Sequence, residues 1–167
     1  MFERLNNPRE AYNHNLGAAL KMEQTVLEML EDNIEAAQNE KAKDLFKHHH
    51  EETEGHVRNI EQAFEALDWD ADTSPCPAIE GIQKEGKANV KKSDDSIIDN
   101  VVLQGAVETE HHEIAVYENL IVNAKAIGRS DVAEILERNL EDERHTLEEV
   151  RGLEASLTGA GTQAASV

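Results

Sequence analysis

The stretch KHHHEETEGH, residues 47–56, holds side chains of the kind that bind metal ions. His49, Glu52 and His56 are spaced i, i+3 and i+7, so in a helix they lie along one stripe. The same stripe is apolar before and after them. A buried charge without a partner costs several kcal/mol, so a polar break in a core-facing stripe requires one. The pattern therefore predicts that these three residues bind a metal ion.

Acidic residues break the apolar stripes of three other segments with helical periodicity. The break is Glu23 in the first segment and Glu143 in the last. In the third segment it is the pair Glu110 and Glu113, followed on the same stripe by Tyr117. The neighbouring stripe positions are apolar at intervals of three and four, as in a helix packed in a bundle. We predict that these acids also face the core.

Start and stop signals divide the chain into four long helices. Asn7 and Pro8 are a typical cap and first residue of a helix. Gly128 suits the left-handed conformation that follows a helix end. The predicted helices are residues 8–37, 42–67, 97–127 and 131–157.

The connection between the second and third helices, residues 68–94, is much longer than a hairpin requires and contains two prolines. A short extra helix is predicted within it, at 78–90. Two short turns and one long crossover are the arrangement of a ferritin-like bundle. We therefore predict an all-α, antiparallel four-helix bundle as a single domain over residues 1–157, with a flexible tail at 158–167.

Counting along these helices places the four breaks at one height. From the centre of the first turn, Glu23 lies 17 residues back and His56 lies 16 residues on. From the centre of the second turn, Glu113 lies 16 residues back and Glu143 lies 14 residues on. At about 1.5 Å per residue these offsets agree to within a few turns, so the breaks should meet. The predicted metal-binding residues are Glu23, His49, Glu52, His56, Glu110, Glu113 and Glu143.

A buried cluster of five carboxylates with one or two histidines requires cations, because the same stripes carry too few Lys or Arg residues to neutralise it. Two metal ions bridged by carboxylates satisfy this requirement. Hard oxygen ligands with imidazole suit iron, and manganese next, better than zinc. The alternative is a hydrated channel, or acids kept neutral by protons and hydrogen bonds.

Composition excludes several other classes of protein. The 16 Lys and Arg residues against 35 Asp and Glu give a net charge of −19, which repels nucleic acid and anionic membranes. Cys76 is the only cysteine, so a cysteine-cluster metal site is excluded. No apolar run approaches the roughly 20 residues that span a bilayer, and no segment is typical of a signal peptide. We expect a cytoplasmic protein.

Three blocks of the sequence resemble the YciE/YciF-type ferritin-like stress proteins. The blocks are His49-x-x-Glu52-Thr53-x-x-His56, Cys76-x-Ala78-Ile79-Glu80-Gly81-Ile82 and Glu110-His111-His112-Glu113-Ile114-Ala115-x-Tyr117. The resemblance implies a four-helix ferritin-like bundle, a homodimer, a dinuclear metal centre and a part in stress responses.

The chain departs from the ferritin-like pattern of two lone Glu residues and two Glu-x-x-His pairs. Thr53 stands three residues before His56, where a Glu is expected, and Thr146 stands three residues after Glu143, where a His is expected. The pair of acids before Tyr117 resembles that of the peroxide-reducing rubrerythrins. Whether Glu80, Asp142 or His145 adds a ligand is left open.

Two functions follow from these observations. The first is a dinuclear iron or manganese centre that oxidises iron or removes peroxide, with peroxide or dioxygen as substrate. In it, Glu52 and another acid bridge the metals, Glu23 and Glu143 are terminal ligands, and Tyr117 is the catalytic residue that hydrogen-bonds a ligand. The alternative is a non-catalytic structural or interaction dimer, induced by stress, with a degenerate metal site.

Overall fold

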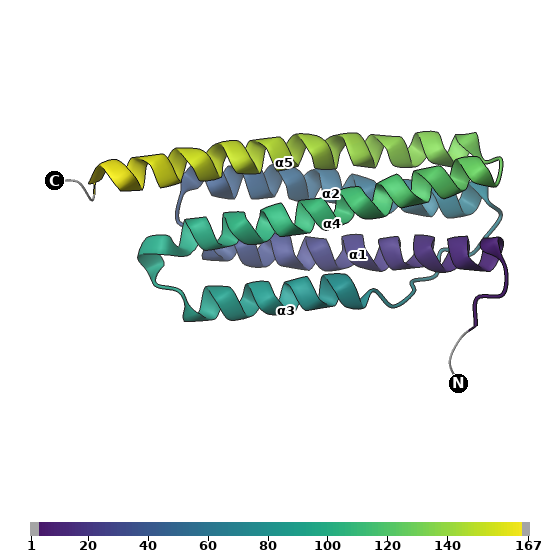
Figure 1. Cartoon of the computed structure of the whole chain (residues 1–167), viewed down its shortest axis with the longest axis horizontal. Coiled ribbons are helices and arrows are strands. Elements are labelled where there is room, and N and C mark those ends of the chain that lie inside the picture. The colour runs from purple at the N-terminus through teal and green to yellow at the C-terminus, as the bar shows by residue number, and fades with distance from the viewer. Residues whose placement is uncertain (1–3, 165–167) are drawn as a thin grey trace.

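The computed structural model describes residues 4–164, and side chains as far as Thr158. This part of the chain is all-helical. Its elements are α1 (Pro8–Ala36), α2 (Glu40–Ala66), α3 (Pro77–Lys92), the 3-10 turn η1 (Asp95–Ile97), α4 (Ile98–Ala126) and α5 (Ser130–Ala164). The helices α1, α2, α4 and α5 form an antiparallel bundle, and α3 lies along its outside against α1 and α4 (Figure 1). The predicted ferritin-like bundle with a crossover helix is confirmed.

Local signals fix the helix ends close to their predicted positions. The side chain of Asn7 accepts a hydrogen bond from the backbone N–H of Glu10 at 3.0 Å, and Pro8 is the first residue of α1. The turn between α1 and α2 is held to the start of α4, because Asp99 Oδ1 accepts from the N–H groups of Gln38 and Asn39 at 2.7 and 3.0 Å. Gly128 has the predicted left-handed conformation, with φ of 78°.

The crossover runs in irregular structure from the end of α2 to α3 and packs directly on α1 at Gly17. A Cβ atom there would lie 2.7 Å from both the carbonyl oxygen of Asp72 and the hydroxyl of Ser74. Only glycine allows this close approach. The contact ties the crossover to the bundle near the end where α1 begins.

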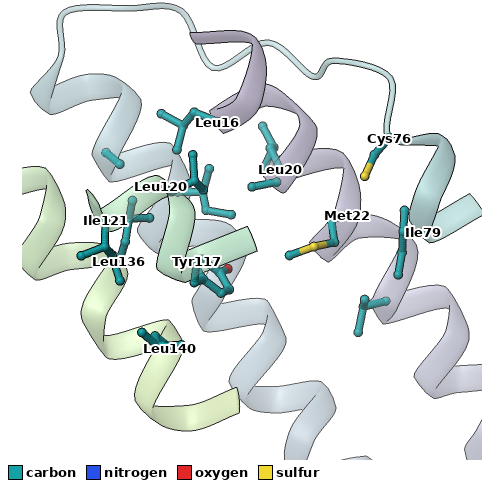
Figure 2. Packing of buried hydrophobic residues seen from close by; sticks show 14 of the residues in the cluster. Leu16, Leu20, Met22, Cys76, Ile79, Tyr117, Leu120, Ile121, Leu136 and Leu140 are labelled. Carbon is teal, nitrogen blue, oxygen red and sulfur yellow. The ribbon is translucent and has the colours of Figure 1, made fainter. Parts of the chain in front are cut away.

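Apolar side chains fill the bundle on both sides of its polar middle. Figure 2 shows part of one such layer, in which Leu16 and Leu20 of α1 lie near Leu120 of α4. Along α1, α4 and α5, the predicted polar breaks are buried between these apolar residues, as the stripes indicate. Cys76 is also buried in the apolar cluster, which agrees with a packing role.

The core-facing side of α2 differs from the predicted stripe at one position. Thr53 is fully buried, and its hydroxyl donates to the carbonyl oxygen of His49 at 2.8 Å. The Glu52 side chain lies at the edge of the bundle and is 21% exposed. The stripe therefore runs His49, Thr53, His56, Ile60, and its predicted passage through Glu52 is wrong.

The last helix is longer than predicted. It continues to Ala164, so residues 158–164 of the predicted tail belong to α5. Residues 165–167 of that tail lie outside the described residues.

Candidate metal centre

The four bundle helices bring six ionisable side chains together in the polar middle. Each is no more than 2% exposed. The six are Glu23 from α1, His49 and His56 from α2, Glu110 and Glu113 from α4, and Glu143 from α5. All six were predicted as metal-binding residues, and the structure places them as one cluster.

Four of the six form one group of possible ligands, which we call the four-residue group: His49, Glu110, Glu113 and Glu143. Each offers one ligand atom, and these atoms lie within 4.8 Å of one another. The Nε2 atom of His49 lies 3.2 Å from Glu110 Oε1 and 3.5 Å from Glu143 Oε2.

A second group, the three-residue group, consists of Glu23, His56 and Glu143, again with ligand atoms within 4.8 Å. The Nδ1 atom of His56 lies 3.0 Å from Glu143 Oε1 and 3.7 Å from Glu23 Oε2. Glu143 belongs to both groups and turns one carboxylate oxygen to each histidine. A carboxylate placed in this way between the two groups could bridge two metal ions.

The inward-facing atoms of the cluster lack ordinary partners. Among the described residues, eight buried atoms of these side chains make no hydrogen bond of ordinary geometry, although some lie at ion-pair distance from one another. They are Glu23 Oε2, His49 Nε2, His56 Nδ1, Glu110 Oε2, both carboxylate oxygens of Glu113 and both of Glu143. Buried polar atoms are normally satisfied, and these are oxygen and nitrogen donors suited to iron or manganese. The residues therefore fit a dinuclear metal centre.

Four carboxylates beside two imidazoles leave the cluster with excess negative charge, and the pKa values reflect it. Burial raises the pKa of Glu113 well above its usual value, with further contributions from Glu143 and Glu23. Burial likewise raises the pKa of Glu143, to about 8. Burial opposes charge on His56, but its carboxylate neighbours Glu143 and Glu23 prevail and raise its pKa to about 11. Without metal, protons must take the place of cations.

Tyr117 is fully buried beside the three-residue group. Its hydroxyl donates to Glu23 Oε1 and accepts from the side-chain amide of Asn139 at 2.9 Å. The amide of Asn139 also lies 3.3 Å from the carbonyl oxygen of His56, while its Oδ1 accepts from Asn59 at 2.6 Å. Burial raises the pKa of Tyr117 well above its usual value, so the phenol remains a hydrogen-bond donor.

Asn139 and Asn59 are not among the residues predicted from the sequence. A signal for Asn139 was available, because it lies four residues before Glu143 and so shares its side of α5. It is a buried amide, and the buried positions that precede it in α5 are apolar.

The outward-facing atoms of both histidines contact side chains that belong to neither group of possible ligands. His49 Nδ1 lies 3.4 Å from Glu52 Oε2 and 3.2 Å from the hydroxyl of Thr146. His56 Nε2 lies 3.3 Å from Asp142 Oδ2. Glu52, predicted as a ligand, thus stands on the outer side of His49, outside both groups.

Two further residues that the sequence offers as possible ligands, His145 and Glu80, lie away from the cluster. The side chain of His145 is 64% exposed and pairs with Glu149 at 3.7 Å. Glu80 is exposed in the first turn of α3.

Comparison with known proteins shows the family to which the chain belongs. Residues 7–163 match the model of a family described as a domain of unknown function, DUF892. The chain belongs to the DUF892 family. It is 28% identical to the protein YciF of Escherichia coli (strain K12) over 139 residues, which cover 82% of this chain and 84% of that one. The resemblance to the YciE/YciF-type proteins is therefore confirmed.

Solved structures show that this DUF892 protein shares its fold with ferritin-like proteins. The E. coli stress protein YciF is 25% identical, with a TM-score of 0.88 over 93% of this chain and 99% of that chain. A structure from Bacillus anthracis str. Ames, described as ferritin like, diiron-carboxylate proteins, is 19% identical, with a TM-score of 0.70 over 90% of this chain and 99% of that chain. At 19% identity, the similarity to the Bacillus anthracis structure shows a shared fold alone. Among residues 4–164, no helix is both long and apolar enough to cross a membrane.

The DUF892 chain contains the usual ferritin-like donor set, distributed differently over the helices. That set comprises four carboxylates and two histidines, with one Glu-x-x-His pair on each of two helices. Here α4 supplies two acids, which makes up for the Glu that is absent at Thr53 on α2. In the same way, α2 supplies two histidines, which makes up for the His that is absent at Thr146 on α5. The totals are the same, and no residue type is missing from the cluster.

Proposed function

We propose that this protein is a metal-binding member of its family with a dinuclear iron or manganese centre in the bundle core. The observation that carries the proposal is the pair of buried ligand groups joined by Glu143. Two neighbouring metal ions would balance the charge of the four carboxylates and satisfy the eight unpartnered atoms. Protons alone can lower the charge, but each added proton supplies a single hydrogen-bond donor, whereas one metal ion would bind several of the unpartnered atoms at once.

The roles of the ligands follow from the direction of their atoms. Glu143 would bridge the two metals, while Glu110, Glu113 and His49 would hold one of them and Glu23 and His56 the other. Bound iron or manganese would supply the redox chemistry needed to oxidise iron or reduce peroxide. Tyr117 would hold the Glu23 carboxylate in place through its hydroxyl.

The two groups offer unequal numbers of ligands, which bears on the substrate. A metal held by three side chains has coordination positions left for a small molecule such as peroxide or dioxygen. Tyr117 and the buried surroundings exclude bulk water from this side. We therefore assign substrate binding to the three-residue group, and a part in stress responses to the protein, in line with the name of the stress protein YciF.

Metal analysis of protein purified without chelators tests the proposal. We expect about two metal ions per chain after growth with added iron or manganese, since the ligand set matches that of dinuclear carboxylate proteins. Anomalous scattering from a crystal would identify the metals and their ligands together. A content below one ion per chain under these conditions would contradict the proposal.

A further inference from the structure

His49 occupies the place that the ferritin-like pattern gives to a residue of another helix. Thr146 stands three residues after Glu143, where a Glu-x-x-His pair on α5 would have its histidine. The Thr146 hydroxyl lies 3.2 Å from His49 Nδ1. Threonine is small enough to leave room for a ring at this point of the core, and the imidazole ring of His49, from α2, occupies that room.

The two histidines present opposite nitrogens to the cluster. His49 directs Nε2 inward, 3.2 Å from Glu110 Oε1, and Nδ1 outward. His56 directs Nδ1 inward, 3.0 Å from Glu143 Oε1, and Nε2 outward to Asp142. They lie seven residues apart on one side of α2, so the difference lies in the ring orientation that the neighbours of each histidine select.

The outward side of His49 is closed by a connected set of hydrogen bonds. His49 Nδ1–H can donate both to Glu52 Oε2, at 3.4 Å, and to the hydroxyl oxygen of Thr146, at 3.2 Å. The Thr146 hydroxyl in turn donates to the same carboxylate at 3.5 Å. With the His49 proton on Nδ1, every member of the set has a hydrogen-bond partner. With the proton on Nε2 instead, Nδ1 would face the Glu52 carboxylate with a lone pair.

We propose that Glu52 and Thr146 are positioning residues that hold the His49 proton on Nδ1 and leave Nε2 as its metal-binding nitrogen. A histidine of α2 thereby replaces the histidine that α5 lacks. The inference rests on the metal-binding function proposed above and deepens it. It also makes Glu52 a positioning residue, whereas the sequence pattern predicts that Glu52 is a metal ligand.

Nitrogen NMR of the Zn²⁺-loaded protein tests the ring orientation directly, because Zn²⁺ is diamagnetic and binds both imidazole and carboxylate. In long-range proton–nitrogen correlation spectra of ¹⁵N-histidine-labelled protein, we expect His49 to carry its proton on Nδ1 and bind Zn²⁺ through Nε2. We expect His56 to show the reverse. Coordination of Zn²⁺ by His49 Nδ1 would overturn the inference.

Four single variants separate a positioning role from that of a ligand, with Zn²⁺ affinity measured by competition with a chelator. Glu52→Leu removes the acceptor and should weaken binding about 10- to 100-fold, the usual range for partners of a metal-bound histidine. Glu52→Gln keeps a carbonyl acceptor and should bind close to the wild type. Thr146→Val should weaken binding in the same direction as Glu52→Leu but less. Glu51→Leu, at an exposed neighbouring position, is the matched control and should change nothing.

Other results of these two experiments would overturn either the positioning role alone or the proposed function with it. Equal losses in Glu52→Gln and Glu52→Leu would show that the negative charge or direct ligation matters, and would overturn the positioning role. Unchanged affinity in Glu52→Leu would do the same. A wild-type protein that takes up no Zn²⁺, iron or manganese would overturn the proposed function and this inference together, whereas Zn²⁺ bound through His49 Nδ1 overturns only the inference.

Discussion

The four-residue and three-residue groups share Glu143 but differ in how firmly their other members are held. In the four-residue group, the outward side of His49 is enclosed by Glu52 and Thr146. In the three-residue group, the outward Nε2 atom of His56 contacts Asp142, whose side chain is 44% exposed. One group has more ligands and a histidine supported by two side chains, and the other has fewer ligands and a histidine supported by one partly exposed side chain.

For the dinuclear centre proposed above, this difference predicts separate tasks for the two metal positions. Ligands whose orientation is fixed before binding lose less entropy when the metal arrives, so the four-residue group should bind first and more tightly. The three-residue group should release its metal more readily and leave coordination positions for a substrate.

Glu143→Gln should remove both metals, because Glu143 is the one residue common to the two groups. An amide oxygen is a weak ligand and carries no charge to balance the cations. We expect the metal content to fall from about two ions per chain to near zero. Metal analysis after gel filtration measures this, with the exposed neighbour Glu141→Gln as control. A variant that retains two ions per chain would rule out Glu143 as the bridge.

Glu113→Gln should separate the groups, because Glu113 belongs only to the four-residue group. We expect this variant to lose one metal and to bind the other more weakly. The metal-free variant should be more stable than the metal-free wild type, since burial strongly disfavours the charged form of Glu113. Each 1 kcal/mol gained should raise Tm by about 2–4 °C in a domain of this size.

Glu23→Gln is the matching variant of the three-residue group and should leave the tighter metal in place. Metal content and thermal melting of both variants, each with and without metal, test the comparison. Loss of the tighter metal in Glu23→Gln, with retention in Glu113→Gln, would reverse the order of the two positions.

Stability of the metal-free protein should fall as pH rises from 6 to 8. The pKa of Glu143 is about 8 in the folded protein against 4.5 for the free side chain, so over this range the folded state holds the proton and the unfolded state does not. His56 acts in the same direction: its pKa is about 11 in the fold and 6.5 outside it. In both cases the stabilisation is complete below the unfolded pKa and is lost as pH rises through the folded one.

Bound metal should remove this dependence, because coordination displaces the same protons and strengthens with pH. Urea unfolding at pH 6, 7 and 8, with and without metal, measures the effect. The stabilisation by metal should grow across this range. A metal-free protein that is equally stable at pH 6 and 8 would show that the cluster does not retain protons in the fold.

Much of the fold was predictable because its determinants are local. Asn7, Pro8 and Gly128 fix helix ends through hydrogen bonds and backbone conformation within a few residues. The height of the polar breaks followed from counting residues, since the rise of a helix is constant. The meeting of Glu23 with Glu143 was therefore accessible from the sequence.

The details of the cluster depend on contacts between helices and were not predictable in the same way. Glu52 and Thr53 lie at about −60° and +40° from His49 around the helix axis, so periodicity alone allows either to face the core. The structure selects Thr53, and α5 presents Thr146 to the side chain of Glu52. The sharing of Glu143 between the histidines likewise arises from the packing of α2 on α5.

Tyr117→Phe should have the smallest effect and should confine it to the three-residue group. The hydroxyl orients Glu23 but belongs to neither group of ligands, so the metal content should remain at about two ions per chain. Without the hydroxyl, Glu23 gains freedom, while Asn139 keeps its hydrogen bond to the carbonyl of His56. The weaker metal should therefore bind less tightly by up to about tenfold, the low end of the range for residues that support a ligand, and the tighter metal should not change. Competition titration resolves the affinities of the two metals. A loss of affinity confined to the tighter metal would show that Tyr117 supports the four-residue group, which would contradict this prediction.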